Sequence, residues 1–446
     1  MFFLVIAVVL TLLYLYGVQQ QSLLVNTDLT RTDQSAYLNT AVLLRTSGYT
    51  ALTDRARMPA FPFLLSLFYE PGITLDELFV RGKLLNIAIS LVSLPLLFGI
   101  FRRYLPLFTA VNLLLIHAFT LYMFKAPFVQ AELLFYLLNF VAYLLMCRLL
   151  WQPVGKRMWP TAVFTGIVLG VAHLTKASVL PGLALFGGTA VLQTVWGWWQ
   201  KRPWQFPDRH FWQQMANPAL VLLFFLLTIW PYIQNSKAQF GHYFYNVNAT
   251  FYMWYDHWDD VEAGTKAYGD RIGWPTMPAD EIPTAAKYFQ DHTPGQIGQR
   301  FFEGALVILI TTTQSYGYVI YLALLSGIVF ILALMNRRQT KQIIKNHLFV
   351  SLFVASYFGS YLLLYAWFWP ISSGNRFVLA LFSPAMFTLA FILYRLFAKQ
   401  LPLKTSRHSE QAVNLGQLLN WAFFAILLVD GYIILTQRIA TVYGGF

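Results

Sequence analysis

Long apolar stretches separated by short polar segments dominate the pattern of hydrophobic and polar positions along the chain. Each stretch is close to the roughly 20 residues that cross a bilayer as a helix. The pattern therefore predicts an all-α polytopic membrane protein with about eleven transmembrane helices, in a single domain over residues 1–446. The predicted spans are 1–18, 84–101, 105–124, 127–147, 159–175, 177–198, 216–233, 316–335, 347–369, 377–398 and 417–436.

Two polar segments, 19–83 and 234–315, are too long to be simple turns. The first has helical apolar patterns near 36–44 and 61–68, and both are too short to span. They are expected to be helices lying in the membrane interface. The second is rich in Trp, Tyr and Asp and ends in an amphipathic stretch over 279–314. Aromatic residues favour the headgroup level, so we expect this segment to rest on the membrane.

Charge supports this class and suggests an orientation. Apolar residues make up 57% of the chain and charged residues 11%, and the net charge is +12. The positive charge is not an indication of nucleic-acid binding, because it is concentrated in short loops that contain almost no acids. This is the positive-inside pattern, which predicts that these loops are cytoplasmic and that 19–83 and 234–315 form outer loops on the other face. The basic loops hold Arg102, Arg103, Arg148, Lys156, Arg157, Lys201, Arg202, Arg209, Arg337, Arg338, Lys341, Lys345, Lys399, Lys404 and Arg407.

The first apolar helix and the single cysteine carry further expectations. The first apolar helix lacks a basic region before it and a clear cleavage site after it, so it is interpreted as a retained anchor. The single cysteine, Cys147, excludes an intrachain disulfide.

Two carboxylates on the predicted outer face are candidate catalytic residues. Asp33 follows the first span, where it could act as a general base on an acceptor from the water side. The competing interpretation is a helix N-cap, and Asp28 is a nearby alternative base. Glu132 begins an apolar helix, and an ionised group there is costly unless it faces a cavity or a partner. A salt bridge to Lys125 or contact with headgroups would also explain it.

Cations on the same face could hold an anionic leaving group such as a lipid phosphate. Their alternative role is interfacial anchoring or simple solvation. His173 lies one turn before a candidate lysine and could face the same cavity, or it could be a core histidine. The candidate cations are Arg55, Arg57, Lys83, Lys176 and Arg376.

A divalent metal is also possible. Asp256, His257, Asp259 and Asp260 offer oxygen and nitrogen ligands, although a solvated acidic loop is the simpler interpretation. The sequence assigns no other cofactor.

Six short motifs, in order along most of the chain, together resemble the GT-C glycosyltransferases. The nearest branch is that of the lipid A aminoarabinose transferases and protein O-mannosyltransferases. This sequence departs from the pattern at Gln34, where an acid is frequent, and at Gln234, where Arg is usual. The motifs are Asp33-Gln-x-x-Tyr37, Arg57-Met-Pro-Ala-Phe-Pro62, Ala131-Glu132, Gly170-Val-Ala-His-Leu-Thr-Lys176, Trp230-Pro-Tyr-Ile-Gln-Asn235 and Asn375-Arg-Phe377.

The resemblance implies transfer of a sugar from a polyprenyl-phosphate donor to an acceptor hydroxyl, with inversion, on the extracytoplasmic side. Asp33 would be the base, Glu132 would orient the acceptor or share a metal with Asp33, and the cations would hold the phosphate. Tyr37, His173 and Asn235 would line the substrate pocket. The acceptor is expected to be a lipid or glycan rather than a protein, and the membrane a bacterial inner or plasma membrane.

Two other classes of function remain open from the sequence. A transporter or flippase of lipid-linked sugars would have internal symmetry and charges at mid-membrane. No pair of similar halves is evident, and the charges gather at one face, which favours the enzyme. A structural membrane subunit would leave Glu132 and Lys176 unexplained.

Overall fold

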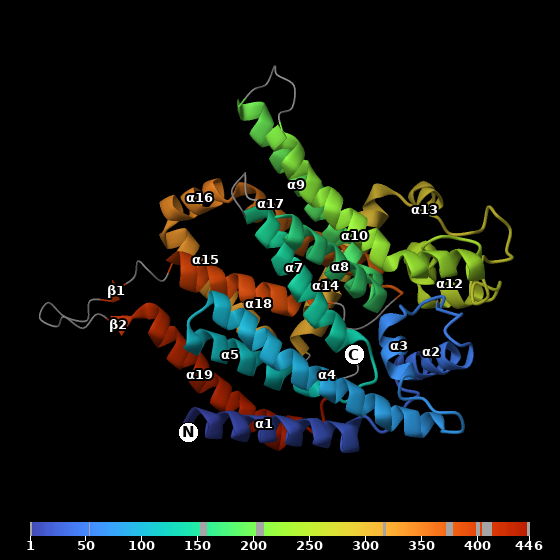
Figure 1. Cartoon of the computed structure of the whole chain (residues 1–446), viewed down its shortest axis with the longest axis horizontal. Coiled ribbons are helices and arrows are strands. Elements are labelled where there is room, and N and C mark those ends of the chain that lie inside the picture. Colours follow the sequence, from blue (N-terminus) through green and yellow to red (C-terminus); the bar gives the residue numbers. More distant parts are fainter. Residues whose placement is uncertain are drawn as a thin grey trace, which may run out of the picture.

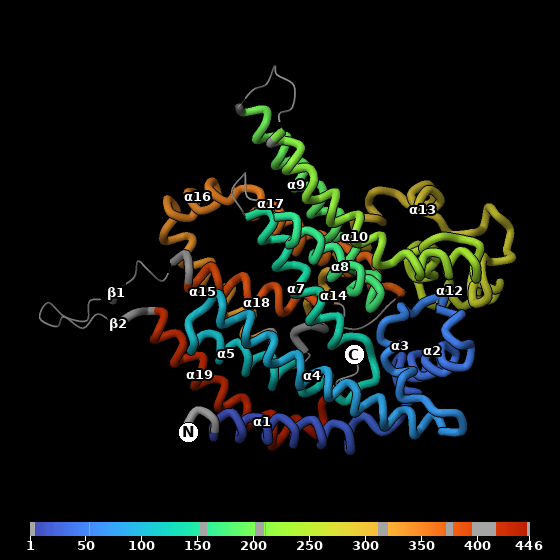
Figure 2. Tube along the Cα trace, viewed as in Figure 1, coloured from blue at the N-terminus to red at the C-terminus, as the bar shows by residue number. Residues whose placement is uncertain are grey.

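The protein is a bundle of long apolar helices with shorter helices gathered at its two ends (Figure 1). The computed structural model describes residues 2–52, 54–151, 158–201, 209–314, 318–371, 378–397, 402–403 and 413–443. The path of the chain can be followed in Figure 2. Its two ends meet where Gln21 Nε2 donates to the carbonyls of Ile439 (2.5 Å) and Val442 (2.8 Å). The architecture is therefore all-α, as the hydropathy pattern predicts.

Helices of every predicted span are present. The longer ones are α1 (Phe2–Gln20), α4 (Leu75–Tyr104), α5 (Leu107–Ile116), α7 (Glu132–Trp151), α8 (Trp159–Thr175), α9 (Leu180–Lys201), α10 (Arg209–Phe240), α14 (Pro294–Gln314), α15 (Tyr318–Met335), α17 (Leu348–Phe368), α18 (Phe382–Phe391) and α19 (Leu415–Ile433). Shorter segments are η1 (Gln21–Val25), α2 (Gln34–Thr46), α3 (Ala60–Ser66), η2 (His117–Tyr122), α6 (Met123–Lys125), η3 (Ala177–Val179), α11 (Val247–Thr250), η4 (Tyr252–Trp254), α12 (Trp258–Ala263), α13 (Ala285–Asp291), α16 (Arg337–Asn346), η5 (Val378–Leu381), η6 (Ile392–Phe397) and η8 (Ile434–Arg438). A two-residue antiparallel pair joins β1 (Pro402–Leu403) to β2 (Val413–Asn414).

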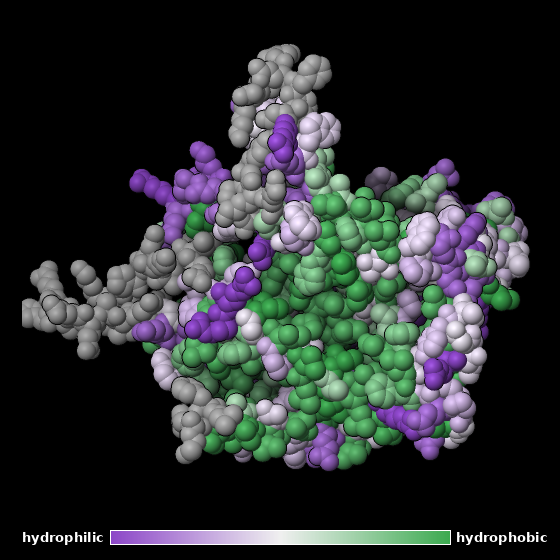
Figure 3. Space-filling view, viewed as in Figure 1, coloured by the Kyte–Doolittle hydropathy of each residue, from purple (hydrophilic) through white to green (hydrophobic). Residues whose placement is uncertain are grey.

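Eight helices of the described part of the chain are long and apolar enough to cross a membrane. They are Val5–Val25, Leu75–Tyr104, Leu107–Lys125, Glu132–Trp151, Ala177–Gln200, Phe211–Phe240, Leu348–Phe368 and Gly416–Arg438. A ninth is possible if Ile320–Met335 and Arg337–Asn346, which meet at a 102° bend, form one broken span. The protein is thus an integral membrane protein, which agrees with an exposed surface that is mostly apolar across its centre (Figure 3).

Helices α8 and α10 approach each other closely through two glycines. A Cβ on Gly166 would lie 2.5 Å from the Val221 carbonyl oxygen, and one on Gly170 would lie 2.5 Å from Thr228 Cβ. The two glycines are four residues apart and so share one helix face. Small residues at this spacing let backbones meet, and van der Waals contact then supplies the association that apolar burial cannot supply inside lipid.

The bundle has two distinct ends, seen at opposite sides of Figure 1. One end, called here the Asp33 end, carries α2 and α3 together with α11–α13 from the large loop. The other, called the basic end, carries α16, and α4 and α7 finish there with Arg103 and Arg148 in their last turns. Helix α2, which Asp33 precedes, and the basic helix α16 therefore lie at opposite sides of the bundle.

The segment over residues 19–83 forms a small core of its own at the Asp33 end. Tyr37 and Leu38 of α2 pack against Phe61 and Leu65 of α3 and against Leu78 of α4. The two predicted helical patterns are confirmed as α2 and α3. A second small core holds part of the large loop, and the backbone amide of Val247 donates to the Arg55 carbonyl (3.0 Å), which joins the two loops.

Candidate active site

Asp33 stands at the N-cap position of α2, yet its side chain does not bond the helix amides. Its Oδ1 lies 2.7 Å from Nη2 of Arg57, and the Asp33 side chain is 24% exposed. Arg57 in turn lies over the Tyr37 ring, 5.7 Å from its centre. The Asp33 carboxylate therefore does not cap α2, contrary to the competing interpretation. It faces a cation and remains accessible.

The residue before this aspartate has an unusual backbone. Thr32 has φ +62°, a left-handed conformation that is unfavourable for a β-branched residue. Its Oγ1 accepts a hydrogen bond from Gln130 Nε2 at 3.0 Å. Strain of this kind persists only where surrounding contacts fix it, and it concentrates at functional sites. The hydrogen bond from Gln130 is one contact that holds the backbone at Thr32, and it thereby helps to orient Asp33.

Gln34 has a structural role on the other side of Asp33. It is fully buried, its Nε2 donates to Asn26 Oδ1, and its Oε1 accepts from Asn26 Nδ2 and from the Val129 amide, each at 2.9 Å. Asn26 Nδ2 also donates to the Pro127 carbonyl at 2.8 Å. These bonds hold residues 127–130 against the start of α2.

Glu132 and Lys176 form a second carboxylate–cation pair. Lys176 Nζ donates to Glu132 Oε1 at 3.1 Å, and the two side chains are 3% and 17% exposed. Glu132 begins α7, whereas Lys176 lies at the break between α8 and η3 with an extended backbone (φ −158°). A buried charge requires such a partner, because unpaired burial costs several kcal/mol. Lys176 is thus an ion-pair partner of Glu132, a contact that the sequence did not predict.

One hydrogen bond links the segments that carry the two pairs. The Gln130–Thr32 bond joins the residue beside Asp33 to a residue two positions before Glu132. The Asp33 end thus carries two carboxylate–cation pairs on segments that contact each other. Carboxylates can take up protons, and Arg and Lys can bind an incoming phosphate, so the site has the groups for transfer of a group from an anionic donor.

Two other predicted cations are engaged in holding loops together. Lys83 Nζ donates to the carbonyls of Ser22 (3.1 Å) and Asn26 (2.8 Å), which lie where the first helix ends. Arg55 donates to the Tyr252 hydroxyl at 2.6 Å and pairs with the fully buried Asp270 at 3.1 Å. Burial raises the pKa of Tyr252 to about 12, so this hydroxyl stays protonated. Neither cation is brought to Asp33.

The predicted pocket residues have packing roles. Tyr37 is buried, with its ring edge-on to Phe61 at 5.5 Å. His173 is buried between the rings of Phe225 and Tyr232. Asn235 accepts from the Leu52 amide at 2.9 Å and donates to the Thr50 carbonyl at 2.6 Å, which ties α10 to the first loop.

Asp28, the alternative base, forms a turn instead. Its Oδ1 accepts from the Thr30 amide and the Thr30 hydroxyl at 2.8 and 2.7 Å. These bonds lower the pKa of Asp28, which makes it a weaker base. Asp33 is the better-placed carboxylate.

The remaining predictions concern a metal and Arg376. Within the described residues, no group of three or more His, Cys, Asp or Glu side chains could hold a metal ion. Asp256 instead pairs with His292 (2.8 Å) and Arg300 (2.9 Å), and Asp260 accepts from the His257 amide at 3.1 Å. Arg376 and the motif around it lie outside the described residues.

Several residues of the site were missed by sequence reasoning. Thr32 and Gln130 are ordinary polar residues without a motif. Arg31 lies 4.7 Å from the centre of the Tyr443 ring, which also packs edge-on to Phe128. Burial raises the pKa of Tyr443. Tyr443 therefore packs against the loop that carries Asp33. This contact joins residues far apart in the sequence, so no periodic pattern of residues predicts it.

Comparison of the chain with protein-family models, with curated proteins and with solved structures finds no match in any of the three.

Proposed function

We propose that the protein is a membrane glycosyltransferase that moves a sugar from a polyprenyl-phosphate donor to an acceptor hydroxyl at the Asp33 end. The observation that supports this is the presence of two carboxylate–cation pairs, Asp33–Arg57 and Glu132–Lys176, on segments that the Thr32–Gln130 hydrogen bond joins. The reaction needs a base for the acceptor and cations for an anionic leaving group, both within reach of lipid.

In the proposed reaction, Asp33 accepts the proton of the acceptor hydroxyl as its oxygen attacks the anomeric carbon. The bond between that carbon and the phosphate oxygen breaks, and the polyprenyl phosphate leaves with the electron pair, so the configuration inverts. Arg57 first orients the Asp33 carboxylate and can then contact the phosphate. Lys176 supplies a second positive charge, and Glu132 orients the acceptor.

The proposal includes a topology with more membrane crossings than the eight spans. The shorter apolar helices Trp159–Thr175 and Val378–Tyr394 and the bent pair would also cross, giving eleven crossings in a GT-C-like arrangement. The Asp33 end would then be extracytoplasmic, in a bacterial inner or plasma membrane. A lipid or glycan acceptor suits this end, where the described loops pack onto the bundle.

A purified, reconstituted protein tests the activity directly. Vesicles would contain synthetic polyprenyl-phosphate sugars and either a membrane-lipid or a glycan acceptor, and the release of polyprenyl phosphate would be measured. Product formation that depends on Asp33 supports the proposal. Absence of product with every donor and acceptor, in protein that stays folded, would overturn it.

One observation favours a flippase as the second candidate. Asp430 lies within the span Gly416–Arg438 and accepts a hydrogen bond from the Tyr321 hydroxyl at 2.7 Å. An ionisable residue inside a span is a common mark of a transport path. The same vesicles distinguish the two candidates, because a flippase moves the intact lipid-linked sugar between leaflets without releasing polyprenyl phosphate.

A further inference from the structure

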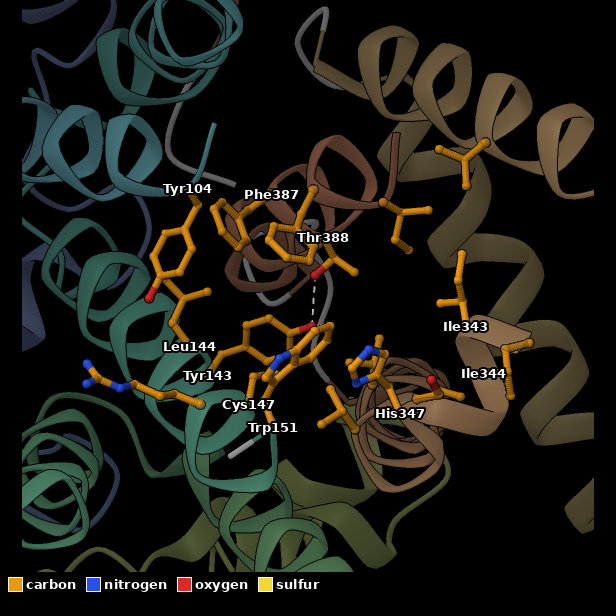
Figure 4. A pocket seen from close by; sticks show the side chains of 18 of the residues that line it. Tyr104, Tyr143, Leu144, Cys147, Trp151, Ile343, Ile344, His347, Phe387 and Thr388 are labelled. Atoms are coloured by element: carbon orange, nitrogen blue, oxygen red, sulfur yellow. Dashed lines mark hydrogen bonds between the residues drawn. The ribbon is translucent and has the colours of Figure 1, made fainter. Parts of the chain in front are cut away.

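An apolar cavity of about 670 Å³ opens at the basic end, away from the Asp33 site (Figure 4). Its walls come from the last turns of α4 and α7, from α15–α17 and from α18 with η6. Tyr143, Cys147 and Phe387 lie on one side of it, and Ile343 and Ile344 of α16 lie on the other. The volume lies within the range of ligand cavities in proteins.

Helix α16 forms one side of this cavity and is strongly amphipathic. Thr340, Ile343, Ile344 and the following His347 face the cavity at helical spacing. The basic residues of the helix, at 337, 338, 341 and 345, are exposed and do not line it. The 102° bend after α15 turns α16 across the bundle. A basic amphipathic helix in this orientation lies at the headgroup level, so the cavity beneath it is at the depth of acyl chains.

Two arginines line the cavity at the ends of transmembrane helices. Arg103 is in the last turn of α4 and Arg148 in the last turn of α7. In the part of the chain that the structure describes, neither forms an ion pair with a carboxylate. This contrasts with Arg55, Arg57 and Lys176 at the other end. The cavity therefore combines an apolar interior with positive charge at its edge.

We propose that this cavity binds an anionic glycerophospholipid of the surrounding leaflet. An acyl chain fills the apolar interior, and the phosphate contacts Arg103 and Arg148. Basic pockets between transmembrane helices hold anionic headgroups in this way. Water does not suit so apolar a space, which offers few polar partners. A leaflet lipid is present at high concentration beside the opening at all times, which favours it over a scarce polyprenyl phosphate.

Lipid retention on the purified protein tests this assignment by native mass spectrometry. The probes are phosphatidylglycerol, phosphatidylethanolamine and undecaprenyl phosphate, each added at equal concentration to delipidated protein. We expect phosphatidylglycerol to be retained most. The double variant Arg103→Gln/Arg148→Gln should lose about tenfold or more of that retention, because the two charge-assisted contacts together contribute at least about an order of magnitude in affinity. Ala355→Phe, which fills the cavity, should reduce retention of all glycerophospholipids.

Arg338→Gln is the matched control, since it removes a charge from α16 without touching the lining, and it should retain phosphatidylglycerol normally. Equal retention of both glycerophospholipids by the unchanged protein would overturn the proposal. Unchanged retention by the double arginine variant, or preferential retention of undecaprenyl phosphate, would do the same.

The only cysteine of the chain gives an independent measurement that needs no variant. Cys147 lines the cavity, so a bound acyl chain should cover it. Modification by N-ethylmaleimide should be slowed by phosphatidylglycerol in the full-length protein and restored by delipidation. A modification rate that is independent of this lipid would contradict an occupant in the cavity.

Discussion

The carboxylate of Asp33 and the guanidinium of Arg57 lie 2.7 Å apart, although Asp33 occupies a position from which an aspartate side chain would ordinarily cap α2. Both side chains are about one-fifth to one-quarter exposed, so a substrate can reach them. The pair directs the carboxylate toward Arg57 and away from the helix amides. An incoming phosphate can also contact Arg57. This contact would not break a hydrogen bond on which α2 depends.

This geometry predicts the behaviour of Asp33→Asn. The change keeps the size of the side chain and removes the proton acceptor. We expect transfer by the purified enzyme to fall by about 100-fold or more, the usual contribution of a general base. Folding should be retained, because the Asp33 side chain does not cap the helix. Turnover in vesicles and the elution profile of the purified protein would measure both effects.

Asp28→Asn is the matched control, as it changes the same chemical group five residues earlier in the chain. Its carboxylate serves a turn with Thr30. Activity should remain within a few-fold of normal, in line with a surface position away from the chemistry. Equal losses in both variants, or near-normal transfer by Asp33→Asn, would remove Asp33 from the role of base.

The Glu132–Lys176 pair should behave as a coupled unit in stability measurements. Glu132→Gln alone leaves a half-buried lysine without its carboxylate, and we expect a cost of about 3 kcal/mol. The double variant Glu132→Gln/Lys176→Met should cost clearly less than the sum of the two single changes. Unfolding in mixed detergent micelles would give the double-mutant cycle. Additive costs would show that the two groups are not energetically paired.

The helices were predictable from sequence because apolar periodicity is local. Each predicted span falls on a helix, and the patterns near 36–44 and 61–68 became α2 and α3. The number of membrane crossings is harder to predict than the helices themselves, because α8 and Val378–Tyr394 are apolar but short. Length decides whether a helix spans, and the hydropathy pattern locates the ends of a helix only to within a few residues.

The partners of charged residues could not be predicted from the sequence. Arg55 and Arg57 are two residues apart, yet one pairs with Asp270 and the other with Asp33. That difference depends on how segments 19–83 and 234–315 meet, which is a property of the tertiary structure. Glu132 is recognisable in the sequence because an ionised group at the start of an apolar helix is costly, and this argument is local. Lys176 stands out only by its place beside a helix and its match to a motif of the family that the chain resembles.

Gln34 offers a test of the hydrogen bonds that hold residues 127–130 against the start of α2. Gln34→Glu puts a carboxylate where an amide nitrogen donates to Asn26 Oδ1, so two acceptors would face each other in a fully buried position. We expect the variant to lose about 2–3 kcal/mol of stability, the cost of an unmet buried donor and an added charge. Gln342→Glu on the exposed face of α16 should change stability by less than about 0.5 kcal/mol. An unchanged stability for Gln34→Glu would show that the bonds with Asn26 do not hold the loop.

Gly170 should be intolerant of a side chain. Gly170→Ala places a Cβ 2.5 Å from Thr228 Cβ, so α8 and α10 would have to move apart. The expected cost is about 1–3 kcal/mol, as for overpacking in a core. Gly187→Ala in α9 is the control, because a Cβ there meets nothing within 4 Å. It should be neutral or stabilise by about 0.4–1 kcal/mol. Similar melting temperatures for the two variants would contradict a close α8–α10 contact.

The orientation of the two ends decides which donor the proposed enzyme could use. The positive-inside pattern assigns the basic end to the cytoplasm, so Asp33 would face the side where lipid-linked sugars, rather than nucleotide sugars, are available. Single cysteines can test this in a Cys147→Ser background. Asp280→Cys in the large loop should react with an impermeant maleimide in intact cells, whereas Gln342→Cys on α16 should react only after permeabilisation. Both positions are exposed, so accessibility within the protein is matched. A cytosolic thiol protein must stay unlabelled in the intact cells. Labelling of Gln342→Cys with protection of Asp280→Cys would place Asp33 in the cytoplasm and contradict the polyprenyl-phosphate donor.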